Sequence, residues 1–438
     1  MMGRQNCAVL GLVIGIIAIN CALVLVLIPS VSTHIGGFYN ANVYADGYQQ
    51  LAANLAAGNG YRFYSDTALT LFREPGYPMV LAAVFTVLGP DFRLVQVANI
   101  IFAVVVAYLM TRIGRTLSTS RIVILGSPLL FLFHPETLIA ESRGGVEILF
   151  CLLLTVYILA VSRAVRTGRW LDYVISGAML GLAVVVRSTP ILFPFGLLVY
   201  LLVVERRRGA ACRNVALMVI AMFVILSPWV IRNYRLTSQF VPTASVLGVS
   251  AHAGLYLSTH PIIGNALVDT EAARERDTLA RQLGYHFRAG YYQYFYSSAD
   301  EVAFSHYLFQ KVVEKYKHCP LLFLRTVGRN LFNFWCGGKT WKSVVLSGII
   351  QFPLVVLAAI GVVTCVRNKR IKAVAPLVLL IVYTVGVSLP ILAQARYSAP
   401  LIPFLAILAC KALVPDRGVQ YAARALCPIG DQISEPTK

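Results

Sequence analysis

The sequence is short of charged residues. Asp, Glu, Lys and Arg make up 13% of its 438 residues, whereas hydrophobic residues make up 58% and the mean hydropathy is +0.71. A soluble fold of this length does not need so much apolar surface, so the composition predicts an integral membrane protein. The apolar run over residues 7–28 is too long for a signal peptide and has no small-residue cleavage site, so we expect it to stay as a first membrane span.

Acidic residues are the scarcer charged class, with 19 Asp and Glu against 38 Lys and Arg, for a net charge of +19. Such an excess could indicate a nucleic-acid partner. However, many basic residues lie in short loops between apolar runs, over residues 112–121, 163–169, 206–213 and 367–372. This is the positive-inside pattern of cytoplasmic loops, so we expect membrane lipids as surroundings and no nucleic acid as a partner.

Several chemical motifs are also absent. The sequence has no Walker or Rossmann motif, which argues against a nucleotide-linked substrate. The seven histidines show no i, i+4 pair and the nine cysteines lack metal-ligand spacing. We therefore predict no obligatory cofactor and no metal site, although a divalent metal stays possible. Cys319 and Cys336 share one predicted outer segment, and whether they pair is left open.

The apolar runs predict an all-α polytopic membrane protein with about ten spans. Alternation from a cytoplasmic N-terminus puts every basic loop inside. Residues 77–89 are too short to cross, so we expect a helix on the outer face. The predicted spans are residues 7–28, 92–112, 122–135, 145–163, 173–188, 190–204, 213–230, 343–366, 373–390 and 396–414.

Four parts follow from this organisation. Residues 1–230 form an N-terminal transmembrane module whose first outer loop, 29–91, carries the predicted catalytic site. Residues 231–342 form a second outer segment with a charged helix over 269–283 and two amphipathic helices over 300–335 that Pro320 separates. Residues 343–414 supply the last spans, and residues 415–438 are expected to be a cytoplasmic tail.

Charged side chains gather at the predicted outer face. Charges are costly near a bilayer core, so their survival there indicates function. Snorkelling explains any single arginine equally well, but it does not explain carboxylates beside the arginines. A guanidinium at a helix end suits a phosphate group. The acids are Asp46, Asp66, Glu74, Glu136, Glu141 and Glu147, and the arginines are Arg73, Arg143, Arg187, Arg232, Arg235 and Arg396.

Motifs in chain order resemble the GT-C glycosyltransferases, in the branch with protein O-mannosyltransferases and lipid A aminoarabinose transferases. Asp46 followed by residues 53–61 resembles the first outer loop of that branch. The further elements are Arg73-Glu74-Pro75-Gly76-Tyr77-Pro78, where the usual proline is Glu74; His134-Pro135 with Glu147; Arg187-Ser188-Thr189-Pro190; Pro228-Trp229 through Arg232-Asn233-Tyr234; and Arg396-Tyr397-Ser398-Ala399-Pro400.

The resemblance implies a GT-C-like bundle and transfer of a sugar from a polyprenyl-phosphate donor to a lipid, glycan or protein acceptor. It implies Asp46 as the catalytic acidic residue, Glu147 as an acid of the second outer loop near the acceptor or the donor, and Arg396 as a phosphate contact. In an inverting reaction the acceptor attacks the anomeric carbon while the lipid phosphate leaves from the opposite face, so we expect Asp46 to act as general base and count Glu147 with it as catalytic. We expect Arg73, Glu74, Tyr77, Arg187, Arg232 and Tyr397 to bind substrate. The expected location is a bacterial inner membrane with the site facing the periplasm.

Two other functions stay open at this point. A transporter or lipid-carrier flippase usually has ionisable residues at the bilayer midplane and inverted repeats, and neither pattern is visible here. A polysaccharide polymerase or ligase of another membrane fold would place its essential residues in 231–342 rather than in 29–91.

Overall fold

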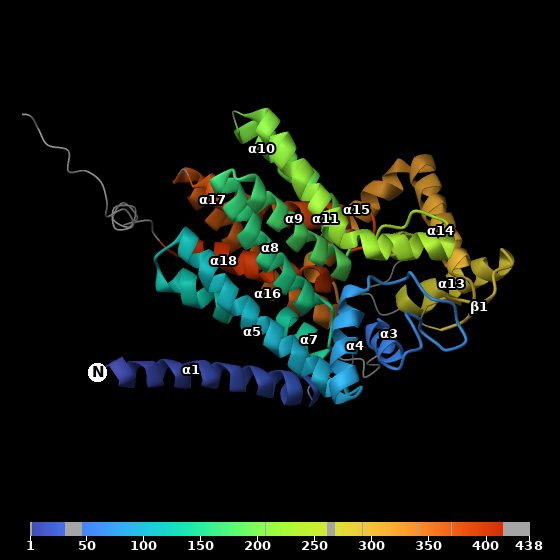
Figure 1. The fold of residues 1–438 in the computed structure, drawn as a ribbon, viewed down its shortest axis with the longest axis horizontal. Helices are drawn as coiled ribbons and strands as arrows, with labels where there is room; N and C mark the ends of the chain where they lie inside the picture. Colours follow the sequence, from blue (N-terminus) through green and yellow to red (C-terminus); the bar gives the residue numbers. More distant parts are fainter. Residues whose placement is uncertain are drawn as a thin grey trace, which may run out of the picture.

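The computed structural model describes residues 2–30, 46–205, 207–260, 268–290, 292–338, 340–368 and 370–414. Over these ranges the regular secondary structure is helical except for one short antiparallel hairpin (Figure 1). The expected tail over 415–438 and residues 31–45 of the first outer loop lie outside the described residues. The elements of the first half are α1 Met2–Ala22, η1 Leu23–Leu27, α3 Tyr48–Ala56, α4 Gly76–Leu88, α5 Phe92–Leu117, η2 Ile122–Gly126, α6 Ser127–Leu132, α7 Pro135–Ser142, α8 Glu147–Thr167, α9 Trp170–Val186, η3 Thr189–Leu192, α10 Phe193–Val204 and α11 Arg208–Thr237.

The second half continues the helical fold. It contains α12 Leu247–Thr259, α13 Val268–Gln282, β1 Phe287–Arg288, β2 Tyr294–Phe295, α14 Ser298–His318, α15 Pro320–Cys336, α16 Trp341–Arg367, α17 Ile371–Ser388, η4 Ala395–Tyr397, η5 Ala399–Leu401 and α18 Ile402–Ala412. The all-α polytopic fold class is thereby confirmed.

The described residues contain six helices long and apolar enough to cross a membrane. They are Val13–Ser30, Phe92–Leu117, Glu147–Thr167, Arg208–Thr237, Trp341–Arg367 and Ile371–Ser388. A seventh span results if the pair Ile122–Leu132 and Pro135–Ser142, which bends by 47°, is counted as one. The count of about ten spans therefore stays a prediction.

The differences arise where proline or a turn interrupts a predicted span. The run over 122–135 ends before Pro135, which opens the separate helix α7. The run over 396–414 begins with two 3₁₀ turns, and its α-helix α18 has only 11 residues. Residues 402–411 of α18 are all buried, so this helix lies inside the bundle. Gly361 of α16 permits this packing, because a Cβ there would lie 1.9 Å from the Leu408 carbonyl oxygen.

The bundle places α9 against both α8 and α11, and α18 against α16. Figure 1 shows α5, α8 and α9 running side by side, with α3, α13 and α14 at the end away from the chain's N-terminus. Gly177 of α9 allows close contact with α11, since a Cβ there would meet the Met218 carbonyl oxygen at 2.2 Å. One apolar core continues through these helices, with Tyr157 and Phe193 edge to face at its centre.

The predicted elements of the second outer segment are found as helices. The charged run over 269–283 forms α13, and the amphipathic run over 300–335 forms α14 and α15, with Pro320 as the first residue of α15. Residues 77–89 form α4, beginning at Gly76. Cys319 and Cys336 are free thiols at opposite ends of α15. A 17-residue helix keeps them about 25 Å apart, beyond the reach of a disulfide.

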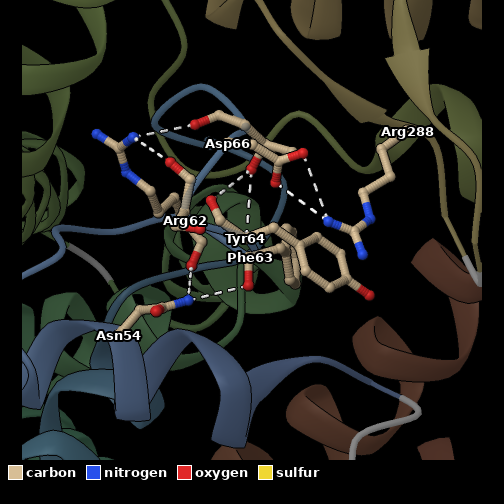
Figure 2. A network of polar contacts seen from close by, with 8 residues as sticks. Asn54, Arg62, Phe63, Tyr64, Asp66 and Arg288 are labelled. Atoms are coloured by element: carbon tan, nitrogen blue, oxygen red, sulfur yellow. Dashed lines mark hydrogen bonds and ion pairs between the residues drawn. The ribbon is translucent and has the colours of Figure 1, made fainter.

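The hairpin was not predicted; in it Phe287 pairs with Phe295 and Arg288 with Tyr294. The loop after α3 rests on it. Figure 2 shows Asn54 donating to the carbonyl oxygens of Arg62 and Phe63, at 2.8 and 2.9 Å. Arg288 reaches the Asp66 carboxylate at 3.1 Å and lies over the Tyr64 ring. Residues far apart in sequence thus form one layer at this end of the bundle.

Candidate active site

One cavity of about 470 Å³ is lined by the loops around α3 and α12 and by the ends of bundle helices such as α8, α9 and α17. Charged side chains form one part of its wall: the carboxylates of Asp46, Glu74 and Glu147 and the guanidinium groups of Arg73, Arg187 and Arg396. An apolar part includes Val146, Phe150, Ile191, Leu192, Val387, Ile391, Leu392, Val246 and Leu247. The cavity therefore suits an amphipathic ligand with one anionic or strongly polar end.

Asp46 lies immediately before α3, whose N-cap Gly47 has φ +77°. A Cβ at Gly47 would also clash with the Phe63 ring at 2.3 Å, so the turn that presents Asp46 requires glycine. One carboxylate oxygen accepts a hydrogen bond from Arg396 Nη1 at 2.6 Å. The other oxygen lies 3.6 Å from Arg73 Nη2, and Arg73 Nε donates to the Asp46 carbonyl oxygen at 3.2 Å.

These contacts set the ionisation of Asp46. Burial by itself raises the pKa of the carboxyl, but the guanidinium groups of Arg396, Arg73 and Arg187 outweigh it and lower the pKa to about 2. Asp46 is therefore a carboxylate at neutral pH and a weak base while both arginines hold it. About a quarter of its side chain, 25%, stays exposed to the cavity.

Aromatic rings also hold Arg73. Its guanidinium carbon lies 5.1 Å from the ring centres of Tyr48 and Tyr292 and 5.2 Å from that of Phe72. A guanidinium group among ring faces gains cation–π attraction and loses freedom of movement. Arg73 is only 13% exposed, whereas Arg396 is 33% exposed. Arg396 is thus the partner of Asp46 that an incoming ligand reaches more easily.

Glu147 and Arg187 form a second ion pair in the cavity wall, with Oε1 and Nη1 3.6 Å apart. Glu147 is the first residue of α8 and Arg187 is the C-cap of α9, so two helix ends present the pair. The Arg187 guanidinium also lies 4.5 Å from the centre of the Tyr397 ring. Tyr397 follows Arg396 in η4, and this ring joins the two charged groups of the site.

Glu74 connects the first outer loop to the hinge after α9. Its Oε1 accepts a hydrogen bond from the Ser188 backbone N–H at 2.9 Å, and the residue is 4% exposed. Gly76 packs on the end of α9, where a Cβ would meet the Val185 carbonyl oxygen at 2.9 Å. Glu74, which stands where the related sequences have proline, thus supplies a hydrogen-bond acceptor. Because Glu74 follows Arg73 and Ser188 follows Arg187, this hydrogen bond fixes the two arginines relative to each other.

Two residues predicted to bind substrate do not line the cavity. Tyr77 is fully buried, and its hydroxyl donates to the Gly144 carbonyl oxygen at 2.8 Å. Arg232 stacks over Trp229 at 4.3 Å and donates to Asn233 Oδ1 at 3.0 Å. Both side chains are occupied by packing within the bundle and the layer at its end. The structure brings together Asp46, Glu147, Arg73, Glu74, Arg187, Arg396 and Tyr397.

A further part of the wall was not predicted. Residues 242–250 and the end of α17 provide it. The lining residues of these two segments are uncharged, so the search for charged side chains at the membrane did not point to them. Behind this part of the wall, Glu301 of α14 accepts hydrogen bonds from Thr70 Oγ1 at 2.6 Å, the Leu71 N–H at 2.9 Å and Ser245 Oγ at 2.6 Å. A buried carboxylate thereby joins the loop that carries Arg73 to the wall.

Across the described ranges no group of three or more His, Cys, Asp or Glu side chains is arranged to hold a metal ion. Guanidinium groups contact both carboxylates predicted to be catalytic, Asp46 and Glu147. The positive charge in this cavity therefore comes from arginine.

One family model of known proteins matches part of the chain. Residues 73–231, a little over a third of the chain, match the family model described as dolichyl-phosphate-mannose-protein mannosyltransferase. No curated protein matches the sequence. The matched segment includes Glu74, Glu147 and Arg187, and the match confirms the resemblance to GT-C glycosyltransferases. It indicates a membrane glycosyltransferase that uses a lipid-linked sugar donor.

Proposed function

We propose that the chain transfers a sugar from a polyprenyl-phosphate donor to an acceptor at the outer face of a bacterial inner membrane, with inversion at the anomeric carbon. The observation that carries the proposal is the meeting of Asp46, Arg73 and Arg396 in one cavity that also has a large apolar wall. The charged part suits the phosphate and sugar, and the apolar part suits the first prenyl units.

Arg396 and Arg187 are the proposed contacts of the donor phosphate. Guanidinium groups fork onto phosphate oxygens, and they stabilise the charge that grows there as the bond from the anomeric carbon to the phosphate oxygen breaks. Because the phosphate is a good leaving group, no nucleotide is needed. The acceptor is a lipid, glycan or protein that attacks from the opposite face of the sugar ring.

Asp46 is the proposed general base. The acceptor oxygen or nitrogen forms the new bond to the anomeric carbon, its proton passes to Asp46, and the bonding electrons leave with the lipid phosphate. The carboxylates and guanidinium groups in the cavity wall are equal in number. A bound phosphate must therefore compete with Asp46 for Arg396. Donor binding would then release one Asp46 oxygen and raise the basicity of the carboxylate before the acceptor reacts.

Glu147 is proposed to act beside the base, near the acceptor or the sugar. Its ion pair with Arg187 holds that guanidinium toward the cavity, and Tyr397 supports it from the other side. Arg73, packed among aromatic rings, fixes the second oxygen of Asp46.

The experiment compares two aspartates in the first outer loop. Purified protein in lipid vesicles is given radiolabelled polyprenyl-phosphate mannose or a polyprenyl-phosphate pentose, with a membrane extract as the acceptor source. We expect Asp46→Asn to lower transfer at least about 100-fold, the range for loss of a general base. Asp66→Asn, which disturbs only the exposed pair with Arg288, should keep transfer unchanged. Full transfer by Asp46→Asn would refute the catalytic role of Asp46.

The same vesicles test the flippase alternative. A flippase would move the labelled lipid between leaflets without releasing its sugar. Movement without transfer, for either donor and with every acceptor fraction, would count against the glycosyltransferase.

A further inference from the structure

α15 exposes an apolar stripe on the side that faces away from the protein. Leu321, Leu324, Leu331 and Phe332 recur at helical spacing and are 74%, 61%, 45% and 50% exposed. The opposite side of the helix buries Thr326, Asn330 and Phe334. An apolar stripe on the outer side of a helix calls for an apolar environment outside the protein.

The place of α15 in the chain identifies that environment. Only residues 337–340 separate its end at Cys336 from Trp341, where the candidate span α16 begins. Trp341 is itself 60% exposed, and tryptophan is a residue type enriched at the boundary between membrane and water. α15 has 17 residues, contains two arginines and is not among the candidate spans. The end of α15 at Cys336 therefore lies at the level of the membrane interface, and the helix itself does not cross the bilayer.

Basic residues border the stripe. Arg325 and Arg329 lie one turn apart along one edge of it, and α15 contains no Asp or Glu. Arg329 Nη1 donates to the His260 carbonyl oxygen at 3.1 Å, which anchors that guanidinium, while Arg325 is exposed.

Lys317, also exposed, precedes α15 at the end of α14. Tyr316 fixes this end of α14 against α15, because its ring packs edge to face on Phe323 at 5.4 Å and its hydroxyl donates to Thr326 Oγ1 at 3.3 Å. The nearest acidic residue in the sequence, Glu314, is engaged by Lys311 at 3.3 Å.

We propose that α15 lies in the plane of the membrane, at the outward-facing interface of the inner membrane. Its apolar stripe lies among the acyl chains, and Arg325, Arg329 and Lys317 contact anionic phospholipid headgroups. An amphipathic helix with basic residues beside its apolar face binds anionic bilayers in this way. Guanidinium groups pair with phosphate, and closely spaced positive charges favour a lipid of net negative charge over a zwitterionic one. None of these residues lines the cavity, so this surface is independent of the proposed reaction.

The test places a photo-crosslinking amino acid at position 324 of the full chain, in vesicles of equal parts phosphatidylglycerol and phosphatidylcholine. Mass spectrometry identifies the crosslinked molecule. We expect lipid adducts in which phosphatidylglycerol exceeds phosphatidylcholine severalfold. The matched position is Val382 on the candidate span α17, which is 64% exposed and has no basic residue within nine positions of it in the sequence. Adducts there should follow the bulk lipid ratio.

A second variant separates charge from simple burial in lipid. With the probe at position 324, Arg325→Gln should lower the enrichment of phosphatidylglycerol roughly fivefold, the effect of one basic residue near an anionic surface. Lys372→Gln, an exposed lysine at the start of α17, should leave it unchanged. Adducts with protein, an absence of lipid adducts, or adducts in the bulk ratio in the unaltered chain would each overturn the proposal.

Discussion

The carboxylate of Asp46 accepts a 2.6 Å hydrogen bond from Arg396, a residue 350 positions further along the chain. One group precedes the first outer helix and the other opens the last helical region, and their contact closes the charged wall of the cavity. It also keeps the pKa of Asp46 near 2. A lowered pKa means that Asp46 is ionised above that value and loses its charge only as the pH falls through it.

We therefore predict that Arg396→Gln moves the acid limb of the pH profile. In the unaltered protein kcat/KM should show no loss due to Asp46 between pH 8 and pH 4, because kcat/KM reports ionisations of the free enzyme. Arg396 supplies the largest of the charges that lower the pKa of Asp46, so its removal raises that pKa, and the loss should begin at a higher pH than in the unaltered protein. Arg288→Gln, at the exposed pair with Asp66 in Figure 2, serves as the control, and its profile should match that of the unaltered protein.

Arg187→Lys should lower kcat/KM for the lipid donor about tenfold. The substitution keeps the positive charge beside Glu147 but removes the planar fork that suits phosphate and the stacking on Tyr397. Initial rates over a range of donor concentrations measure it. Arg288→Lys makes the same change over the Tyr64 ring at the surface and should have no effect. An Arg187→Lys enzyme with unchanged kcat/KM would remove Arg187 from the donor site.

Glu301 is expected to act on stability and on the position of the cavity wall. Glu301→Ala leaves the Leu71 N–H and the hydroxyl groups of Thr70 and Ser245 buried without their acceptor, which should cost about 3 kcal/mol or more of unfolding free energy.

Glu301→Gln should be much milder, because the amide keeps one acceptor oxygen and can donate to a hydroxyl. Burial also raises the pKa of the Glu301 carboxyl, so its charge adds little stability. Thermal unfolding in detergent measures both variants. Glu314→Gln, which breaks only an exposed pair with Lys311, should change stability by less than about 0.5 kcal/mol.

Chelation of divalent ions should leave the initial rate of transfer unchanged within about twofold. Arginine side chains supply the positive charge beside Asp46 and Glu147, so the leaving phosphate can be stabilised without a metal ion. Transfer rates before and after dialysis against a chelator decide this. A loss of activity that Mg²⁺ or Mn²⁺ restores would contradict the prediction.

Local patterns fixed much of what the sequence could predict. The apolar runs gave the helical class and most helix positions, and Pro320 marked the break between α14 and α15. Local composition could not show that α18 is buried on all sides, since a buried helix and a lipid-facing one are equally apolar. It could not reveal the hairpin either, because strands of two residues show no period.

The chemistry available at the site can be read from the sequence alone. The sequence supplies Asp46, Arg73, Glu147, Arg187 and Arg396, in motifs that resemble one glycosyltransferase branch. Tertiary structure alone decided which of them share a cavity, because ion pairs across hundreds of residues depend on how the helices pack. That packing drew Asp46 to Arg396, turned Arg232 onto Trp229 outside the cavity, and brought an uncharged part of the wall from residues 242–250 to the same cavity as the charged part.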